Sequence, residues 1–115
     1  MSKRGDIEFL QDIEEAGRRI LEYLDKIQYK QFTEDIKTQD AVIRNFEIIG
    51  EVVKNISKEL RERYPQVVWG DLAKVRDKLI HHYFGVNVDI IWDISEEELP
   101  QLILEIREIL KDFDK

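Results

Sequence analysis

Residues 39–63 read QDAVIRNFEIIGEVVKNISKELRER and carry the strongest helical periodicity in the chain. Apolar side chains recur there three and four positions apart, at Val42, Phe46, Ile49, Val53, Ile56 and Leu60. Ile48 and Val52 widen this stripe to about 160° on an ideal helical wheel, which is more than one packed face requires. The pattern predicts one long helix that either lies at the centre of the molecule or meets a partner along its extra edge.

A first helix is predicted before this segment. Its apolar positions also recur at three and four residues, and they run from about Asp6, a candidate N-cap, to about Ile27. Gly17 interrupts the pattern at a cost of about 1 kcal/mol relative to Ala, which we attribute to close helix packing. A polar connection around residues 28–37 then leads into the long helix.

The second half of the chain predicts two more helices. Tyr64-Pro65 ends the long helix, because the residue before a proline disfavours helical dihedral angles. A third helix is expected over about residues 70–83. The last helix opens either with a capping box at Ser95–Glu98 or at Pro100, and a short helical or extended piece precedes it.

The composition agrees with a helical domain. With 43% hydrophobic and 37% charged residues, 115 residues can fold around one core, and five Gly and two Pro are few for a β-sandwich. We therefore expect an all-α fold, a compact bundle of four to five helices, in a single domain spanning residues 1–115. No cysteine is present, which excludes disulfides and Cys-ligated metals. No signal-peptide core or membrane span of about 18–20 apolar residues is visible, so we expect a cytoplasmic protein.

Charge is unevenly distributed along the chain. The net charge of −7 argues against a surface that is basic all over, as general nucleic-acid binding would require. Residues 54–82, however, hold seven basic and four acidic side chains, a net +3, which leaves −10 for the remainder. The two histidines of the chain, His81 and His82, close this segment. A solvated helical surface accounts for these charges equally well.

Most sequence templates for catalysis are absent, including Gly-rich phosphate loops, His-Glu-x-x-His and Cys/His metal spacings. What remains is RDKLIHHYFG at residues 76–85. On a helical wheel, four side chains fall within about 60° of Arg76: Leu72, Leu79, Ile80 and Tyr83. The guanidinium is therefore expected in or beside the apolar stripe, where it must be paired or face a cleft. His81 lies about 140° away. A buried structural arginine paired with a carboxylate, beside ordinary surface histidines, is the alternative.

The segment resembles the signature of the HEPN superfamily of all-helical ribonuclease domains. The matching pattern is Arg-x4-His-x-Tyr, with Arg76, polar Asp77, His81 and Tyr83. The surroundings are similar to those of the HepT-like branch, at Trp69, Asn87–Trp92 and Leu99-Pro100. The resemblance extends over nearly the whole chain. Family members often carry Asn after the Arg, whereas Asp77 places an acid beside a proposed phosphate site.

This resemblance implies a homodimeric toxin that cuts RNA without a metal or other cofactor, with Arg76 and His81 as catalytic residues. It also implies a partner, a small nucleotidyltransferase antitoxin that transfers AMP to Tyr83 and so silences the nuclease. Asp77, Lys78 and His82 are expected to support the site or contact substrate, with packing or capping as the alternative for His82.

Metal-independent RNA cleavage requires groups of this kind. A base takes the 2′-OH proton, a cation stabilises the charged phosphorane, and an acid protonates the departing 5′-oxygen. Histidine titrates near neutrality, and arginine stays charged and grips phosphate oxygens. Because His81 supplies one proton-transfer role per chain, we expect a composite site at the two-fold axis of a homodimer, where two His81 and two Arg76 surround one cleft.

Two other function classes stay open from the sequence. A non-catalytic helical binding module could partner a nucleotidyltransferase through the same helix. A purely structural helical dimer would need none of these side chains. Substituting Arg76 or His81 distinguishes the classes, because only a catalytic site loses RNA cleavage while it keeps partner binding.

Overall fold

A computed structural model describes residues 5–79 and 87–114, and all regular secondary structure in those ranges is helical. The elements are α1 (Asp6–Leu24), α2 (Tyr29–Thr33), α3 (Ile36–Val53), α4 (Lys58–Arg63), α5 (Trp69–Ala73), α6 (Val75–Leu79), α7 (Val88–Asp93), the π-helix η1 (Ile94–Glu98) and α8 (Leu99–Phe113). The expected all-α class is confirmed. None of these described helices is long and apolar enough to cross a bilayer.

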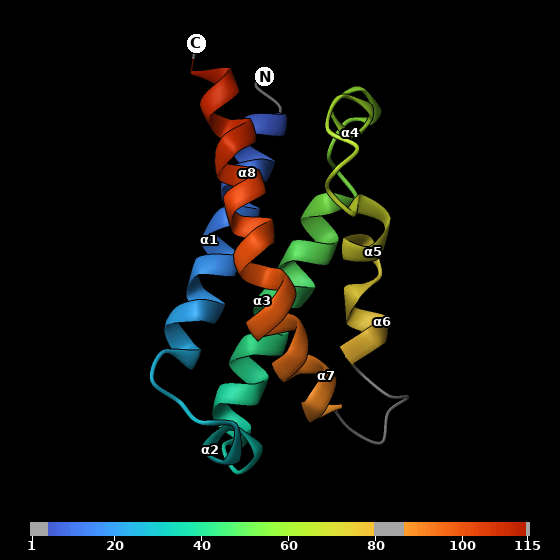
Figure 1. Ribbon diagram of the computed structural model, residues 1–115. Helices are drawn as coiled ribbons and strands as arrows, with labels where there is room; N and C mark the ends of the chain where they lie inside the picture. The colour runs from blue at the N-terminus through green and yellow to red at the C-terminus, as the bar shows by residue number, and fades with distance from the viewer. Residues whose placement is uncertain (1–4, 80–86, 115) are drawn as a thin grey trace.

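Helix α3 is the centre of the fold. It packs against α1, α2, α5, α6 and α7, and it passes through the middle of the molecule with α1 on one side and α5 and α6 on the other (Figure 1). Val42, Phe46 and Ile49 on its inner face are at most 2% exposed. Ile48 and Val52 are half-buried against the same core. The wide apolar stripe is therefore explained by the central position of the helix.

Asp35 caps the start of α3. Its carboxylate accepts hydrogen bonds from the Thr38 hydroxyl at 2.6 Å and from the Thr38 backbone N–H at 3.0 Å. These bonds, the hydroxyl one foremost, hold the pKa of Asp35 below its ordinary value. With this cap, α3 begins at Ile36, three residues before the predicted start.

The prediction of one helix over residues 39–63 is wrong at its C-terminal end. Helix α3 stops at Val53, and Ser57 begins α4 by accepting the Leu60 N–H on its Oγ at 3.1 Å. Ile56 and Leu60 are nevertheless buried. Because these two side chains continue the spacing of the stripe across the break, periodicity alone does not reveal it.

Asp6 explains why the chain turns at Ser57. The Ser57 backbone N–H and hydroxyl both donate to the Asp6 carboxylate, at 2.9 and 2.6 Å. The prediction that Asp6 is the N-cap of the first helix is wrong, since Gly5 occupies that position and Asp6 is the first helical residue. The Asp6 carboxylate thus joins the start of α1 to the start of α4.

Two further boundaries differ from the prediction. Helix α1 ends at Leu24 rather than near Ile27, and Lys26 then adopts a left-handed conformation with φ 62°. The segment predicted as a polar connection contains α2, whose Phe32 is fully buried. A single buried side chain in a five-residue helix is too little for a periodic signal.

The third helix, predicted over residues 70–83, is interrupted. Lys74 separates α5 from α6 with φ −108° and ψ 10°, and residues 80–83 lie outside the described part of the chain. Gly50 of α3 explains where α5 lies, because a Cβ there would be 3.2 Å from the Leu72 carbonyl oxygen and 3.7 Å from that of Ala73. The end of α5 therefore packs directly on the backbone of α3.

Helices α7, η1 and α8 follow one another in helical conformation, so Ser95–Glu98 do not form the predicted capping box. The Leu99 N–H instead donates to the Ile94 carbonyl across a wide π turn. Pro100 accounts for this turn, because its ring has no N–H and clashes with the carbonyl four residues earlier in a regular helix. The short piece before the last helix, left open as helical or extended, is helical.

The packing of α1 on α8 uses Gly17. This glycine is buried, and a Cβ built on it would lie 2.9 Å from Ile103 Cγ1 of α8. A side chain at position 17 would push the two helices apart, so the expected close helix packing is confirmed.

Ser57→Ala is expected to lower the free energy of unfolding by about 1–2 kcal/mol, because it removes the α4 cap and one hydrogen bond to Asp6. Urea denaturation followed by circular dichroism measures this. Thr33→Ala is the control, because that exposed hydroxyl donates to Lys30 within its own helix, and its effect should stay within about 0.5 kcal/mol. Equal losses in both variants would contradict the role of Ser57.

Candidate active site

Arg76 is the second residue of α6 and points away from the core. The adjacent Val75, together with Leu79, is buried and holds α6 on α3. The Arg76 side chain is 59% exposed, and its Nε donates to Oε2 of Glu47 at 3.0 Å. The guanidinium is therefore exposed and paired. The expected pairing is confirmed, and the alternative of a buried structural arginine is wrong in its burial.

Glu47 is the partner that sequence analysis missed. It stands on α3 directly after the buried Phe46, is 31% exposed, and is 29 residues from Arg76 in the chain. The sequence did contain one indication of Glu47: it is a carboxylate at the edge of the apolar stripe of α3. Because Glu47 engages Nε, and the terminal nitrogens of Arg76 make no hydrogen bond among the described residues, those nitrogens can grip an anion.

Lys78 and Asp77, the other predicted supporting residues on α6, differ in their position relative to Arg76. Lys78 is about 200° round the helix from Arg76, and its Nζ lies 3.9 Å from Asp71 Oδ2. The structure therefore does not bring Lys78 to Arg76. Asp77 is exposed and directly follows Arg76, so it keeps a negative charge close to the guanidinium.

His81, His82 and Tyr83 lie outside the described residues. Leu79 and Asn87, on either side of that segment, are joined by a hydrogen bond from the Asn87 N–H to the Leu79 carbonyl at 2.9 Å. The Asn87 side chain also caps α7 by accepting the Ile90 N–H at 3.1 Å. The chain therefore leaves and rejoins the described structure at the end of α6, three residues beyond Arg76.

Aromatic residues fix the elements around this point. Trp69 at the start of α5 is buried, and its Nε1 donates to the Tyr64 carbonyl at 2.9 Å. The Trp92 ring of α7 packs on Phe32 and Tyr29 of α2, with ring centroids 5.4 and 5.6 Å apart. These packed rings anchor the helices that enter and leave the site.

Tyr64 ties the end of α4 to the last helix. Its hydroxyl donates to the Asp112 carboxylate at 2.7 Å. This hydrogen bond, together with burial and the nearby negative charge, raises the pKa of Tyr64 above its ordinary value.

The arrangement suits recognition of a phosphate group. An exposed guanidinium, backed by a carboxylate and mounted on a packed helix, offers N–H donors that no described residue engages. Within residues 5–79 and 87–114, no three acidic or imidazole side chains gather to hold a metal ion.

A sequence profile described as Ribonuclease HepT-like matches residues 13–109. The chain belongs to the HepT-like ribonuclease family. The match extends from α1 into α8 and therefore includes both Glu47 and Arg76. A comparison with solved structures gave no match.

Relatives cover nearly the whole of this HepT-like chain. "Putative RNase MJ0127" of Methanocaldococcus jannaschii is 47% identical over 114 residues, which cover 99% of this chain and 94% of that protein. "Probable ribonuclease HepT" of Thermococcus cleftensis is 45% identical over 100 residues, 87% of this chain and 91% of that protein. "Gamma-glutamylcyclotransferase and putative RNase MJ0434" of M. jannaschii is 42% identical over 108 residues, but the match spans only 48% of it.

The Glu47–Arg76 pair is expected to contribute little to stability, because both side chains are partly in water. A double-mutant cycle with Glu47→Gln and Arg76→Gln should give a coupling energy of about 0.5 kcal/mol that falls as salt is added. Chemical denaturation of the four proteins measures it, with the exposed Glu51–Lys54 pair as the control. A coupling above about 2 kcal/mol would assign the pair to the stability of the fold.

Proposed function

We propose that this HepT-like chain is a metal-independent endoribonuclease toxin in which Arg76 and His81 act on the scissile phosphate. Relatives that match nearly its whole length carry ribonuclease names, which supports the reaction class. The observation that carries the proposal is the exposed Arg76 guanidinium, whose terminal nitrogens are unengaged among the described residues. It stands on the helix that leads directly into the segment containing His81.

Each proposed role follows from the chemistry of the side chain. One His81 removes the 2′-OH proton, so that the 2′-oxygen attacks phosphorus, and a second proton donor protonates the 5′-oxygen as its bond to phosphorus breaks. Arg76 stabilises the added negative charge of the phosphorane. Glu47 acts as a positioning residue, because its bond to Nε aims the terminal nitrogens of Arg76 outward.

A homodimer supplies the second proton-transfer group. One His81 per chain can act as base or as acid in a turnover, whereas two copies around a two-fold axis provide both at once. The exposure of Arg76 supports this arrangement, since a buried guanidinium could not face a second copy.

The proposed partner is a nucleotidyltransferase antitoxin that attaches AMP to Tyr83. The added phosphate and adenosine would occupy the space meant for RNA phosphate, and their charge and bulk would block cleavage. Asp77 favours a second candidate function, a non-catalytic module that binds the same transferase, because it places a carboxylate next to Arg76.

Arg76→Ala is expected to lower the rate of RNA cleavage about 10²–10³-fold through the lost phosphorane stabilisation. His81→Ala should lower it about 10²–10⁴-fold through the lost proton transfer. Glu47→Gln should cost less than Arg76→Ala and act mainly on KM. End-mapping of products from total RNA, with and without EDTA, measures all three.

Lys54→Ala is the matched control, because it removes an exposed cation at the end of α3. Undiminished cleavage in both the Arg76 and His81 variants would contradict the catalytic roles of these two residues. A monomer in sedimentation velocity that keeps full activity would contradict the composite site.

Tyr83→Phe is expected to keep the nuclease toxic in the presence of the co-expressed transferase. Intact mass measurement of the wild-type chain should show an increase of about 329 Da per transferred AMP, which the Phe variant lacks because it has no phenolic oxygen. An inhibited complex with an unmodified Tyr83 would contradict this mode of silencing.

A further inference from the structure

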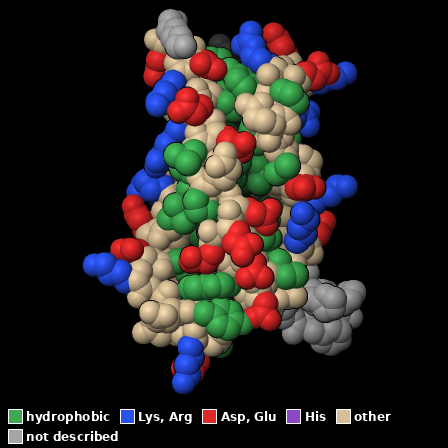
Figure 2. Space-filling model, viewed as in Figure 1, with side chains coloured by type: hydrophobic (Ala, Val, Ile, Leu, Met, Phe, Trp, Pro, Cys, Tyr) green, Lys and Arg blue, Asp and Glu red, His purple; other side chains and the backbone are tan. Residues whose placement is uncertain are grey.

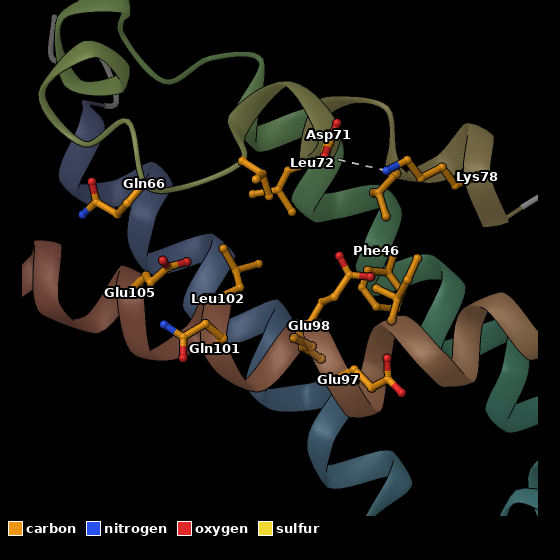
Figure 3. A pocket seen from close by; sticks show the side chains of 14 residues that line it. Phe46, Gln66, Asp71, Leu72, Lys78, Glu97, Glu98, Gln101, Leu102 and Glu105 are labelled. Carbon is orange, nitrogen blue, oxygen red and sulfur yellow. Dashed lines mark ion pairs between the residues drawn. The ribbon is translucent and has the colours of Figure 1, made fainter.

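An apolar groove lies on the flank of α6 opposite to Arg76. Its walls are α5 and α6 on one side and η1 and α8 on the other, with Phe46 of α3 between them (Figure 3). The volume is about 320 Å³, and the apolar lining consists of Phe46, Val68, Leu72, Val75, Ile94, Leu99 and Leu102. This volume is at the low end of the roughly 300–1,000 Å³ of small-molecule sites. The groove therefore suits a few anchoring side chains of a larger partner.

Carboxylates dominate the rim of this groove. Glu97, Glu98 and Glu105 stand on the η1–α8 wall and form no ion pair with a described residue, whereas Asp71 on the opposite wall lies 3.9 Å from Lys78. Figure 2 shows acidic side chains gathered over the junction of α7 and α8, beside apolar surface. Uncompensated negative charge next to an apolar floor selects a partner that is both cationic and apolar.

The spacing of the carboxylates fits a helical partner. Glu98 and Glu105 are seven residues apart, which is about 10 Å along a helix. A helix laid in the groove would present its positions i, i+3, i+4 and i+7 over the same length. Basic residues at its flanks would then meet Glu98 and Glu105 while apolar residues between them reach Phe46.

The π-helix η1 is a second, independent feature of this wall that is typical of functional sites. It contributes Ile94, Glu97 and Glu98 to the groove. The same turn buries the Ser95 hydroxyl, which has no hydrogen-bond partner in the described structure and therefore costs stability. Such turns occur often at functional sites, because the extra residue redirects the neighbouring side chains.

Two other occupants fit the rim less well. RNA is a polyanion, and three carboxylates that pair with no cation in the described part of the chain would repel its phosphates. A second copy of the chain would bring a net charge of −7 to an acidic rim. Charge complementarity therefore favours a basic protein segment.

We infer that this groove docks a basic amphipathic helix of a partner protein, with apolar side chains on the Phe46 floor and Lys or Arg side chains against Glu97, Glu98 and Glu105. The inference does not depend on the proposed nuclease activity. It concerns the opposite flank of α6 from Arg76.

The test uses the whole chain and a fluorescein-labelled helical peptide about four turns long, with leucines on one face and lysines elsewhere. The groove variant carries Glu97→Gln, Glu98→Gln and Glu105→Gln. The matched control carries Asp25→Asn, Glu34→Gln and Glu59→Gln, which remove the same charge from exposed positions outside the groove. A third variant, Val68→Ser, shortens an exposed apolar side chain of the lining.

In fluorescence anisotropy at about 0.1 M salt, the groove variant is expected to bind the peptide at least tenfold more weakly than wild type. The control should change less than about threefold, and Val68→Ser should weaken binding severalfold while circular dichroism stays unchanged. A peptide with glutamates in place of the lysines should not bind.

Equal weakening in the groove and control variants would overturn the inference, because the peptide would then sense only the net charge. A loss of self-association in the groove variant without peptide, measured by sedimentation velocity, would assign the groove to a second copy. Weaker binding of a labelled RNA oligonucleotide to the groove variant would assign it to RNA. Either of these results would also overturn the inference.

Discussion

The backbone contact between α3 and α5 at Gly50 sets the position of α5 and of the α6 helix that directly follows it. A glycine inside a helix costs about 1 kcal/mol relative to Ala, and a Cβ at this position would come within 3.2 Å of the Leu72 carbonyl oxygen. Without that Cβ, α5 lies directly on α3. Helix α6, which follows α5, packs on α3 as well. Only from this position does Arg76 reach Glu47, and only then do α5 and α6 form a wall facing α8.

Periodicity predicted which faces are buried but not where the helices break. Ile56 and Leu60 continue the stripe of α3, so the sequence reads as one helix through Ser57. The break depends on the Asp6 carboxylate, which is 51 residues away and is brought to Ser57 only by folding. Tertiary hydrogen bonds of this kind leave no periodic signal in the sequence. The interruption at Lys74 leaves none either, because α5 is held there by its contact with the α3 backbone.

The site was predictable in the same partial way. The motif identified Arg76, and the wheel placed its guanidinium where it needed a partner or a cleft. The identity of that partner depends on α6 packing against α3, so Glu47 could not be selected from among the many carboxylates of the chain. The separation of Lys78 from Arg76 was predictable, because two residues along a helix correspond to about 200°.

The two flanks of α6 therefore carry opposite electrostatics. On one flank, Arg76 presents terminal guanidinium nitrogens that bind no residue of the described chain, whereas Lys78 on the other borders an acidic rim. On the proposed function, the RNA site and the acidic rim lie on different flanks of α6, which reconciles a net charge of −7 with a site for a polyanion.

A five-residue helix such as α6 has little stability of its own, so its position depends on its contacts. Val75 and Leu79 attach it to α3, Lys74 interrupts the chain on one side, and the Leu79–Asn87 hydrogen bond closes the other. A helix in the groove would contact α6 at Lys78, and a phosphate would contact it at Arg76. If the two ligands prefer different positions of α6, each changes the affinity of the other by the same factor. If they prefer the same position, each strengthens the binding of the other. The two flanks are independent only if at least one ligand binds equally well to every position of α6.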